Sequence, residues 1–278
     1  MSQSHHLLII GGPNAGKTHF VGQLYHRLDA GESAYSMVTA PADLTVIKAI
    51  IDRLVQGRAG GHTESGLNKE INFVVANAHT QIALAFPDYG GEQVRGLVSD
   101  RLVSSRWHEL ITQADEWLLL IRPDEIPELE DITTRGFANL EDLKARTAQA
   151  QSKAELTEPG FYIELLQMML FVKGQSLLTL VRTPRLTVAL SCWDTLGLAD
   201  ECVEPLAELR QRLPFVAAFL ETVWAPGSWR VCGLSSLGRT LDPDKSDDEF
   251  MNNGPEPAGY VVLPSGAHDA DLTQLITF

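Results

Sequence analysis

The chemistry of this sequence begins near the amino terminus, at Gly11 and at the consecutive residues Gly16, Lys17 and Thr18. Their spacing fits the phosphate-loop pattern G-x-x-x-x-G-K-[ST]. Between the two fixed glycines stand Gly12, Pro13, Asn14 and Ala15. In such a loop backbone N–H groups surround a polyphosphate, Lys17 reaches the outer phosphates as a point charge, and the Thr18 hydroxyl ligates Mg²⁺. The alternative is a glycine turn that binds nothing.

A strand before this loop and a helix after it would hold these residues in place. Residues 7–10 form a continuous apolar run, which predicts a short buried strand. Behind the loop, Val21, Leu24, Tyr25 and Leu28 recur at helical spacing, which predicts a helix over 17–28. The positive end of that helix would face the phosphates.

Two later apolar runs, at residues 71–76 and 81–86, are separated by only a few residues. So short a connection forces the two strands to pair antiparallel, because a parallel pair needs a much longer crossover. Asp88 and Gly91 follow the second run in a D-x-x-G pattern. At the carboxyl end of a buried strand, Asp88 could hold the water shell of Mg²⁺ and the Gly91 N–H could meet a terminal phosphate. A turn without function is the alternative.

Strands and helices alternate along the rest of the chain. Other strands are predicted at residues 117–121, 186–190, 229–232 and 260–263. Helices are predicted at 44–55, 94–111, 161–180, 206–220 with a break or kink at Pro214, and 271–276. This order predicts a three-layer α/β sandwich whose sheet is mostly parallel with one antiparallel strand. We expect one elaborated domain over residues 1–278, with a helical insertion at about 122–158 and an acidic loop at about 242–259.

Composition excludes several kinds of partner. The 278 residues carry a formal net charge of −14, so the surface should repel nucleic acid and anionic lipid. The three cysteines lack metal-site spacing and are expected to be reduced thiols. The apolar run at 165–172 is far too short to cross a membrane. We therefore expect a cytoplasmic protein that binds neither nucleic acid nor membrane.

The order of these motifs resembles that of Ras-like GTPases of the translation-factor-related, or TRAFAC, class of P-loop NTPases. The loop GGPNAGKT is similar to the phosphate loop of bacterial Era-like GTPases, and DYGG is similar to their D-x-x-G motif. Ser191-Cys192-Trp193-Asp194 stands where the family has [NT]-K-x-D. Ser235, Ser236 and Leu237 stand where it has S-A-[KL]. The resemblance implies a Ras-like fold that binds GTP and GDP with Mg²⁺.

In this family the aspartate of the [NT]-K-x-D motif reads the base. The resemblance implies that Asp194 accepts hydrogen bonds from N1 and the exocyclic amine of guanine, which adenine cannot donate. Trp193 and the run from Ser235 to Leu237 would complete the base site. Cys192 departs from the family, because a lysine whose stem stacks along the base usually stands there. A helix-capping role for Asp194 is the alternative.

The family also implies a threonine that closes on Mg²⁺ and the terminal phosphate. Thr63, in the glycine-rich stretch 56–66, is the candidate, with Thr45 as the second choice. The residue that orients the attacking water is usually a glutamine directly after the D-x-x-G glycine. Here Glu92 occupies that position and Gln93 follows it, so hydrolysis should be slow, or depend on a partner or on another residue such as Arg58.

The function implied is a slow GTP-hydrolysing switch in which Lys17, Thr63, Glu92 and Gln93 surround the reacting phosphate. A protein effector or complex subunit would read the nucleotide state. More narrowly, the chain resembles bacterial double-GTPase domains proposed to act in conflict or antiviral systems. The alternatives are a nucleotide-binding scaffold without turnover and, third, a P-loop ATPase or small-molecule kinase.

Overall fold

The computed structural model describes residues 3–31, 33–60, 70–87, 92–126, 157–176, 178–198 and 202–278. Within these residues nine strands form one sheet in the order β2-β3-β4-β1-β5-β6-β7-β8-β9. The strands are β1 Gln3–Gly11, β2 Ser36–Thr39, β3 Ile71–Ala76, β4 Thr80–Phe86, β5 Glu116–Ile121, β6 Arg185–Ser191, β7 Trp229–Ser235, β8 Tyr260–Val262 and β9 His268–Asp269. The predicted α/β class is confirmed.

The centre of the sheet is parallel. Strands β4, β1, β5, β6 and β7 run in one direction, with Leu7 beside Leu84 and Ile9 beside Leu118. β3 is the predicted antiparallel strand, and Asn77 closes its hairpin by accepting hydrogen bonds from the N–H groups of His79 and Thr80. β8 pairs antiparallel with β7, so the sheet contains a second strand that runs against the central direction.

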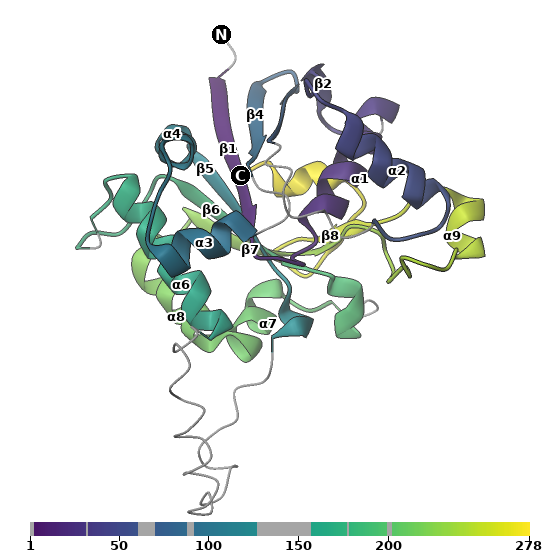
Figure 1. The fold of residues 1–278 in the computed structure, drawn as a ribbon. Helices are drawn as coiled ribbons and strands as arrows, with labels where there is room; N and C mark the ends of the chain where they lie inside the picture. The colour runs from purple at the N-terminus through teal and green to yellow at the C-terminus, as the bar shows by residue number, and fades with distance from the viewer. Residues whose placement is uncertain are drawn as a thin grey trace, which may run out of the picture.

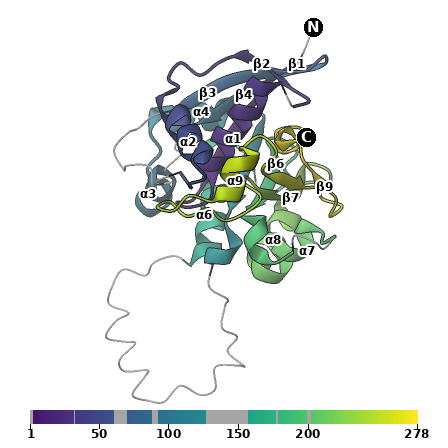
Figure 2. The same ribbon diagram turned by 90° about the vertical axis from the view of Figure 1, so that its right-hand side faces the viewer.

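Helices cover both faces of this sheet, as Figures 1 and 2 show. They are α1 Lys17–Ala30, α2 Thr45–Val55, α3 Glu92–Asp100, α4 Ser105–Gln113, α6 Glu158–Val172, α7 Pro205–Arg212, α8 Pro214–Val223 and α9 Asp248–Asn253. Side chains alternate along β1, so Leu7 and Ile9 pack with α1 and α2, whereas Leu8 and Ile10 pack with α3, α4, α6, α7 and α8. The result is the predicted three-layer sandwich.

Several helix bounds differ from the prediction. The single helix expected over 94–111 is wrong, because Arg101 adopts a left-handed φ of 52° and Ser104 starts a new helix by accepting a hydrogen bond from the Trp107 N–H. α6 ends at Val172, eight residues before the predicted end at 180, because Gly174 turns the chain with a φ of 74°. The break expected at Pro214 separates two helices, α7 and α8.

The two expected insertions have different outcomes. Beyond a short 3-10 turn, η1 Pro123–Glu125, most of the stretch 122–158 lies outside the described residues, and the single-domain assignment stays a prediction. The acidic stretch 242–259 contains α9, and Leu241 and Phe250 pack against Ile50 and Leu54 of α2. It is thus anchored rather than free. None of the helices described here is long and apolar enough to cross a membrane.

Candidate functional site

The loop between β1 and α1 has the backbone that an anion site requires. Asn14 and Gly16 have left-handed φ values of 57° and 77°. At Gly16 a residue with a Cβ would be strained, whereas glycine adopts this conformation without steric cost. Gly16 is the N-cap of α1, and no side chain among the described residues caps that helix end. No acidic residue stands in the first turn. The positive end of the α1 dipole is therefore not compensated by a carboxylate of its own first turn.

Lys17 lies across this loop. Its ammonium donates hydrogen bonds to the carbonyl oxygens of Gly11 and Gly12, both at 2.7 Å, and the residue is only 3 % exposed. Two backbone acceptors compensate the burial of the charge. The carbonyl oxygens of Gly11 and Gly12 thus hold the Lys17 ammonium at the rim of the loop.

A cavity of about 370 Å³ opens beside the loop. Nine of the predicted site residues line it: Pro13, Asn14, Ala15, Gly16, Lys17, Thr18, Asp194, Ser236 and Leu237. They come from three places far apart in the sequence, namely the start of α1, the end of β6 and the end of β7. This is the edge where parallel strands end and where α/β sheets bind ligands.

Asp194 is held in the cavity wall by its neighbours. Cys192 adopts a left-handed φ of 54° directly after β6, and it, not Asp194, is the N-cap of the short helix η2 Trp193–Leu196. The Ser235 hydroxyl donates to Asp194 Oδ1 at 2.5 Å and accepts from the Gly238 N–H at 2.9 Å. Ser235 is fully buried, so it orients the carboxylate from behind and does not line the cavity.

Trp193 faces the other way. Its indole is fully buried in the core, where it packs closely over Gly233, and it is not among the residues that line the cavity. In this structure Trp193 therefore anchors the loop that carries Asp194 and offers no surface to a ligand.

The predicted residues around the reacting phosphate are less completely placed. Thr63, Asp88 and Gly91 lie outside the described residues, and Glu92 is the first residue of α3, with a side chain that is likewise outside them. Gln93 Oε1 accepts a hydrogen bond from the Trp107 indole at 3.1 Å, and Gln93 does not line the cavity.

The two second-choice residues also lie outside the cavity lining. Thr45 is an exposed residue at the start of α2, and Arg58 donates to the Ser246 hydroxyl at 3.1 Å. Neither side chain is positioned by a contact that leads to the loop.

Two residues of the cavity carry chemistry that no motif indicated. His19, in the first turn of α1, accepts a hydrogen bond at Nε2 from the Gly60 N–H at 2.8 Å. Burial, and then the charge of Arg122, lowers the pKa of His19 to about 4, so the ring is neutral at pH 7 with its proton on Nδ1. Arg122 follows β5 directly, and its place at the end of a central strand was the available signal.

The remaining members of the lining come from three places: the residues after α2, the end of β6 with the turn that follows it, and the segment after β7. They are Ala59, Gly60, Ser191, Cys192, Thr195, Arg239, Thr240, Leu241 and Pro243. Burial raises the pKa of the Cys192 thiol to about 11, so this side chain is uncharged in the cavity.

A central parallel sheet, a glycine loop with its lysine, and an aspartate at the end of β6 define a P-loop GTPase of the TRAFAC class. The chain belongs to the Double-GTPase 1 family, whose sequence model matches residues 8–278. Membership in this family supports binding of GTP. No curated protein is similar enough in sequence to count as a relative.

Solved structures of G domains are distantly similar. The Arl6 BBS3 small GTPase from Trypanosoma brucei, with bound GppNp, is 10 % identical over 84 % of this chain and 88 % of that one, with a TM-score of 0.37. The G domain of the T. maritima FeoB iron transporter is 11 % identical over 90 % of this chain and 98 % of that one, with a TM-score of 0.31. The GTP-bound S. cerevisiae Ski7 GTPase-like domain is 11 % identical over 84 % of this chain and 43 % of that one, with a TM-score of 0.41.

Proposed function

We propose that this protein is a guanine-nucleotide switch that binds GTP and GDP, hydrolyses GTP slowly and signals its state to a protein partner. One observation carries the proposal: a single cavity joins the loop from Pro13 to Thr18 with the carboxylate of Asp194. Its volume, about 370 Å³, lies within the range of small-molecule sites. A polyphosphate at one end and a base at the other would fill it.

In this proposal the phosphates and the base of the nucleotide are recognised by different kinds of interaction. The loop amides and Lys17 favour negative charge of any nucleotide, so they give affinity without choosing a base. Asp194, fixed by Ser235, offers two acceptor oxygens to a base that presents two neighbouring N–H donors. Guanine presents such a pair and adenine does not, so Asp194 gives the proposed preference for GTP over ATP.

Mg²⁺ is the cofactor that the family implies, and the residues present fit it in part. Thr18, which carries a hydroxyl oxygen, lines the cavity beside Lys17. Among the described residues no group of three His, Cys, Asp or Glu side chains forms a metal site. That agrees with Mg²⁺, which is usually held by one or two protein oxygens together with substrate phosphates and water. Thr18, with Asp88 and Thr63 as further candidates, would hold the ion, which would neutralise charge on the phosphates.

Slow turnover is proposed because the glutamine nearest the D-x-x-G motif has another partner. Gln93 bonds the Trp107 indole in the packing between α3 and α4. The same observation favours a second function, a scaffold that holds nucleotide without hydrolysing it. A place in a bacterial conflict or antiviral system is the finest part of the proposal, and it rests on the family resemblance.

Calorimetry with GTP, GDP and ATP in the presence of Mg²⁺ tests the binding claim. We expect binding of GTP and GDP, at least 100-fold weaker binding of ATP, and loss of nucleotide binding in Lys17→Ala. Lys48→Ala, an exposed lysine on α2, is the matched control and should bind as the wild type does. Equal affinity for ATP would remove the guanine claim.

Phosphate release then separates the two functions. Steady release of phosphate from GTP above the Lys17→Ala background supports the switch. Tight binding with release no faster than that background would replace the switch by the scaffold.

A further inference from the structure

Arg122 is a planar cation in the wall of the cavity that the proposed function does not use. We propose that Arg122 holds the purine ring, by stacking one face of its guanidinium on the base that Asp194 reads. The inference rests on the proposed function, since it assigns a further specificity-determining residue to the same site.

The sheet places Arg122 next to the base-reading loop. In the parallel register Ile121 of β5 lies beside Leu190 of β6, so Arg122, which follows β5, stands next to Ser191, the last residue of β6, at the carboxyl edge of the sheet. The Ser191 hydroxyl donates to the Ile121 carbonyl at 3.1 Å and fixes the two strand ends to one another. Asp194 follows three residues after Ser191, and both Arg122 and Asp194 line the cavity.

The edges of the Arg122 guanidinium are occupied by carboxylates. Nε and Nη2 donate to the two oxygens of Asp124 at 2.9 and 3.1 Å, and Nη1 lies 2.9 Å from Glu125 Oε1. This fork fixes the plane of the group, and two negative charges already compensate its positive charge. A phosphate would have to displace or approach these carboxylates. Within the described ranges no aromatic ring stacks on the flat faces of the group, and an arginine face stacks well on a nucleobase.

The other side chains of the cavity are poorly suited to this task. No phenylalanine, tyrosine or tryptophan of the described chain lines it. Lys17 bonds the loop carbonyls, and His19 bonds Gly60. Arg239 is more exposed than Arg122, at 39 % against 28 % of the side chain, and bonds Glu249 at 2.8 Å on the outer segment. Cys192 offers only a small neutral thiol. Of the two arginines in the lining, Arg122 is the one that follows β5, the strand paired with β6.

Calorimetric titration of the full chain with GDP and Mg²⁺ tests the inference with three variants. Arg122→Ala removes the group, and Arg122→Lys keeps the charge but loses the flat face. Arg210→Ala, which breaks a surface pair with Glu221 on the α7–α8 hairpin, is the control. We expect Kd for GDP to rise about tenfold in Arg122→Ala and nearly as much in Arg122→Lys, with Arg210→Ala unchanged. Thermal unfolding without nucleotide checks that each variant is folded.

The outcomes separate this inference from the proposed function. If the wild type binds GDP and Arg122→Ala binds within twofold of it, the inference is overturned and the proposed function stands. If Arg122→Lys binds like the wild type, charge rather than stacking acts there, and the inference is also overturned. If the wild type itself binds no guanine nucleotide, the proposed function fails first. Should Arg122→Ala not fold, the Arg122→Lys result decides alone.

Discussion

At the scale of single residues, the proposed recognition of guanine depends on the two acceptor oxygens of Asp194. In Asp194→Asn one acceptor becomes an NH₂ donor, which opposes the guanine amine but suits the carbonyl that xanthine carries at the same position. We expect affinity for GDP to fall about 100-fold and affinity for xanthosine diphosphate to rise. Competition titrations with the two nucleotides measure this change. Asp52→Asn, an exposed site on α2, is the control, and an unchanged preference in Asp194→Asn would refute the base assignment.

The loop that carries Asp194 depends on Gly233, which lies against the Trp193 indole. A Cβ at Gly233 would lie 2.6 Å from Trp193 Cε3 and 3.0 Å from the Val262 Cβ, so Gly233→Ala must displace the buried indole. We expect a loss of about 1–3 kcal/mol in the free energy of unfolding, measured with urea, because overpacking a filled core is costly. Nucleotide affinity should fall as well, since Asp194 follows Trp193. Gly96→Ala is the matched control.

Gly96 lies in α3, where a Cβ would meet nothing within 4 Å. Alanine there should leave stability unchanged or raise it by up to about 1 kcal/mol, because alanine favours helix more than glycine does. Equal stability of the two variants would show that the contact at Trp193 relaxes without cost.

Residue types at fixed spacing predicted that Gly16, Lys17 and Thr18 would lie together at one site, because each has a proposed role that few other residues can perform, and all three line the cavity. Asp194 came from a motif that was only partly present, with Cys192 in place of the usual lysine. His19 and Arg122 were missed. Their role depends on which strand ends and loops meet at the cavity, and that information lies in the strand order rather than in any short sequence.

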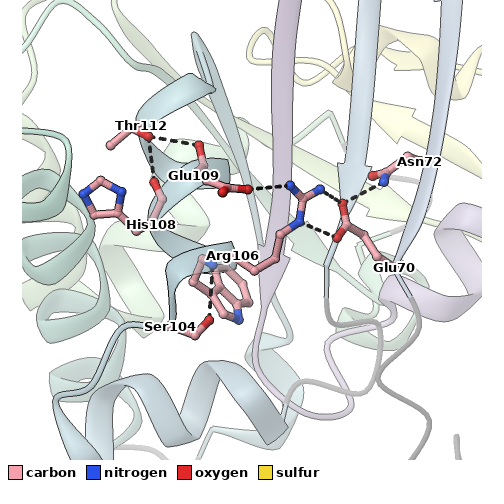
Figure 3. A network of polar contacts seen from close by, with 8 residues as sticks. Glu70, Asn72, Ser104, Arg106, His108, Glu109 and Thr112 are labelled. Carbon is pink, nitrogen blue, oxygen red and sulfur yellow. Dashed lines mark hydrogen bonds and ion pairs between the residues drawn. The ribbon is translucent and has the colours of Figure 1, made fainter.

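At the scale of elements, an ion pair joins α4 to the start of β3, as Figure 3 shows. Arg106 donates from Nε to Glu70 Oε2 at 2.8 Å, a second nitrogen bonds the other oxygen, and Asn72 donates to Glu70 at 2.7 Å. Hydrogen bonding to Arg106 holds the pKa of Glu70 below its usual range. Half of the Arg106 side chain is exposed, so solvent screens the pair.

A lowered pKa in the folded state fixes the sign of the pH dependence. Glu70 contributes stability above its unfolded pKa of about 4.3, and this contribution disappears as the pH falls through the lower folded value. Glu70→Gln should therefore cost about 0.5–1 kcal/mol at pH 7 and nearly nothing in strong acid. Urea unfolding at several pH values measures it. In an Arg106→Met background, Glu70→Gln should not change the free energy of unfolding. An equal loss of stability at every pH would contradict a stabilising role for the Arg106–Glu70 ion pair.

Helices and strands with a regular apolar pattern were predicted well. Elements whose bounds depend on local backbone conformation, or whose side chains are mostly exposed, were not. The hairpin of β3 and β4 followed from two apolar runs with a short connection. The break between α3 and α4 contains neither glycine nor proline, and its only marker was Ser104 three residues before a buried tryptophan. β2 was missed because it is a four-residue edge strand with mostly exposed side chains, which leaves no alternation to detect.

At the scale of the whole molecule, the segment after β7 connects the nucleotide cavity to the far side of α1. Leu237 and Leu241 line the cavity and also pack with α2, and Asp247 donates its N–H to the Gly57 carbonyl at 2.9 Å. Farther on, Arg27 of α1 bonds the backbone carbonyls of Ala258, Gly259 and Ala270. The segment is therefore in contact with the cavity and α2 near its start and with α1 farther along.

This continuity makes a prediction about unfolding. If residues 1–278 are one domain, thermal unfolding followed by calorimetry should show one transition, and all of it should move when nucleotide binds. At a GDP concentration 100 times Kd the stabilisation is about 2.7 kcal/mol, which corresponds to a rise in Tm of about 5–10 °C for a chain of this size. Lys17→Ala should show the single transition without the rise. Two transitions, of which GDP moved only one, would show that the chain contains a second unit that unfolds independently of the cavity.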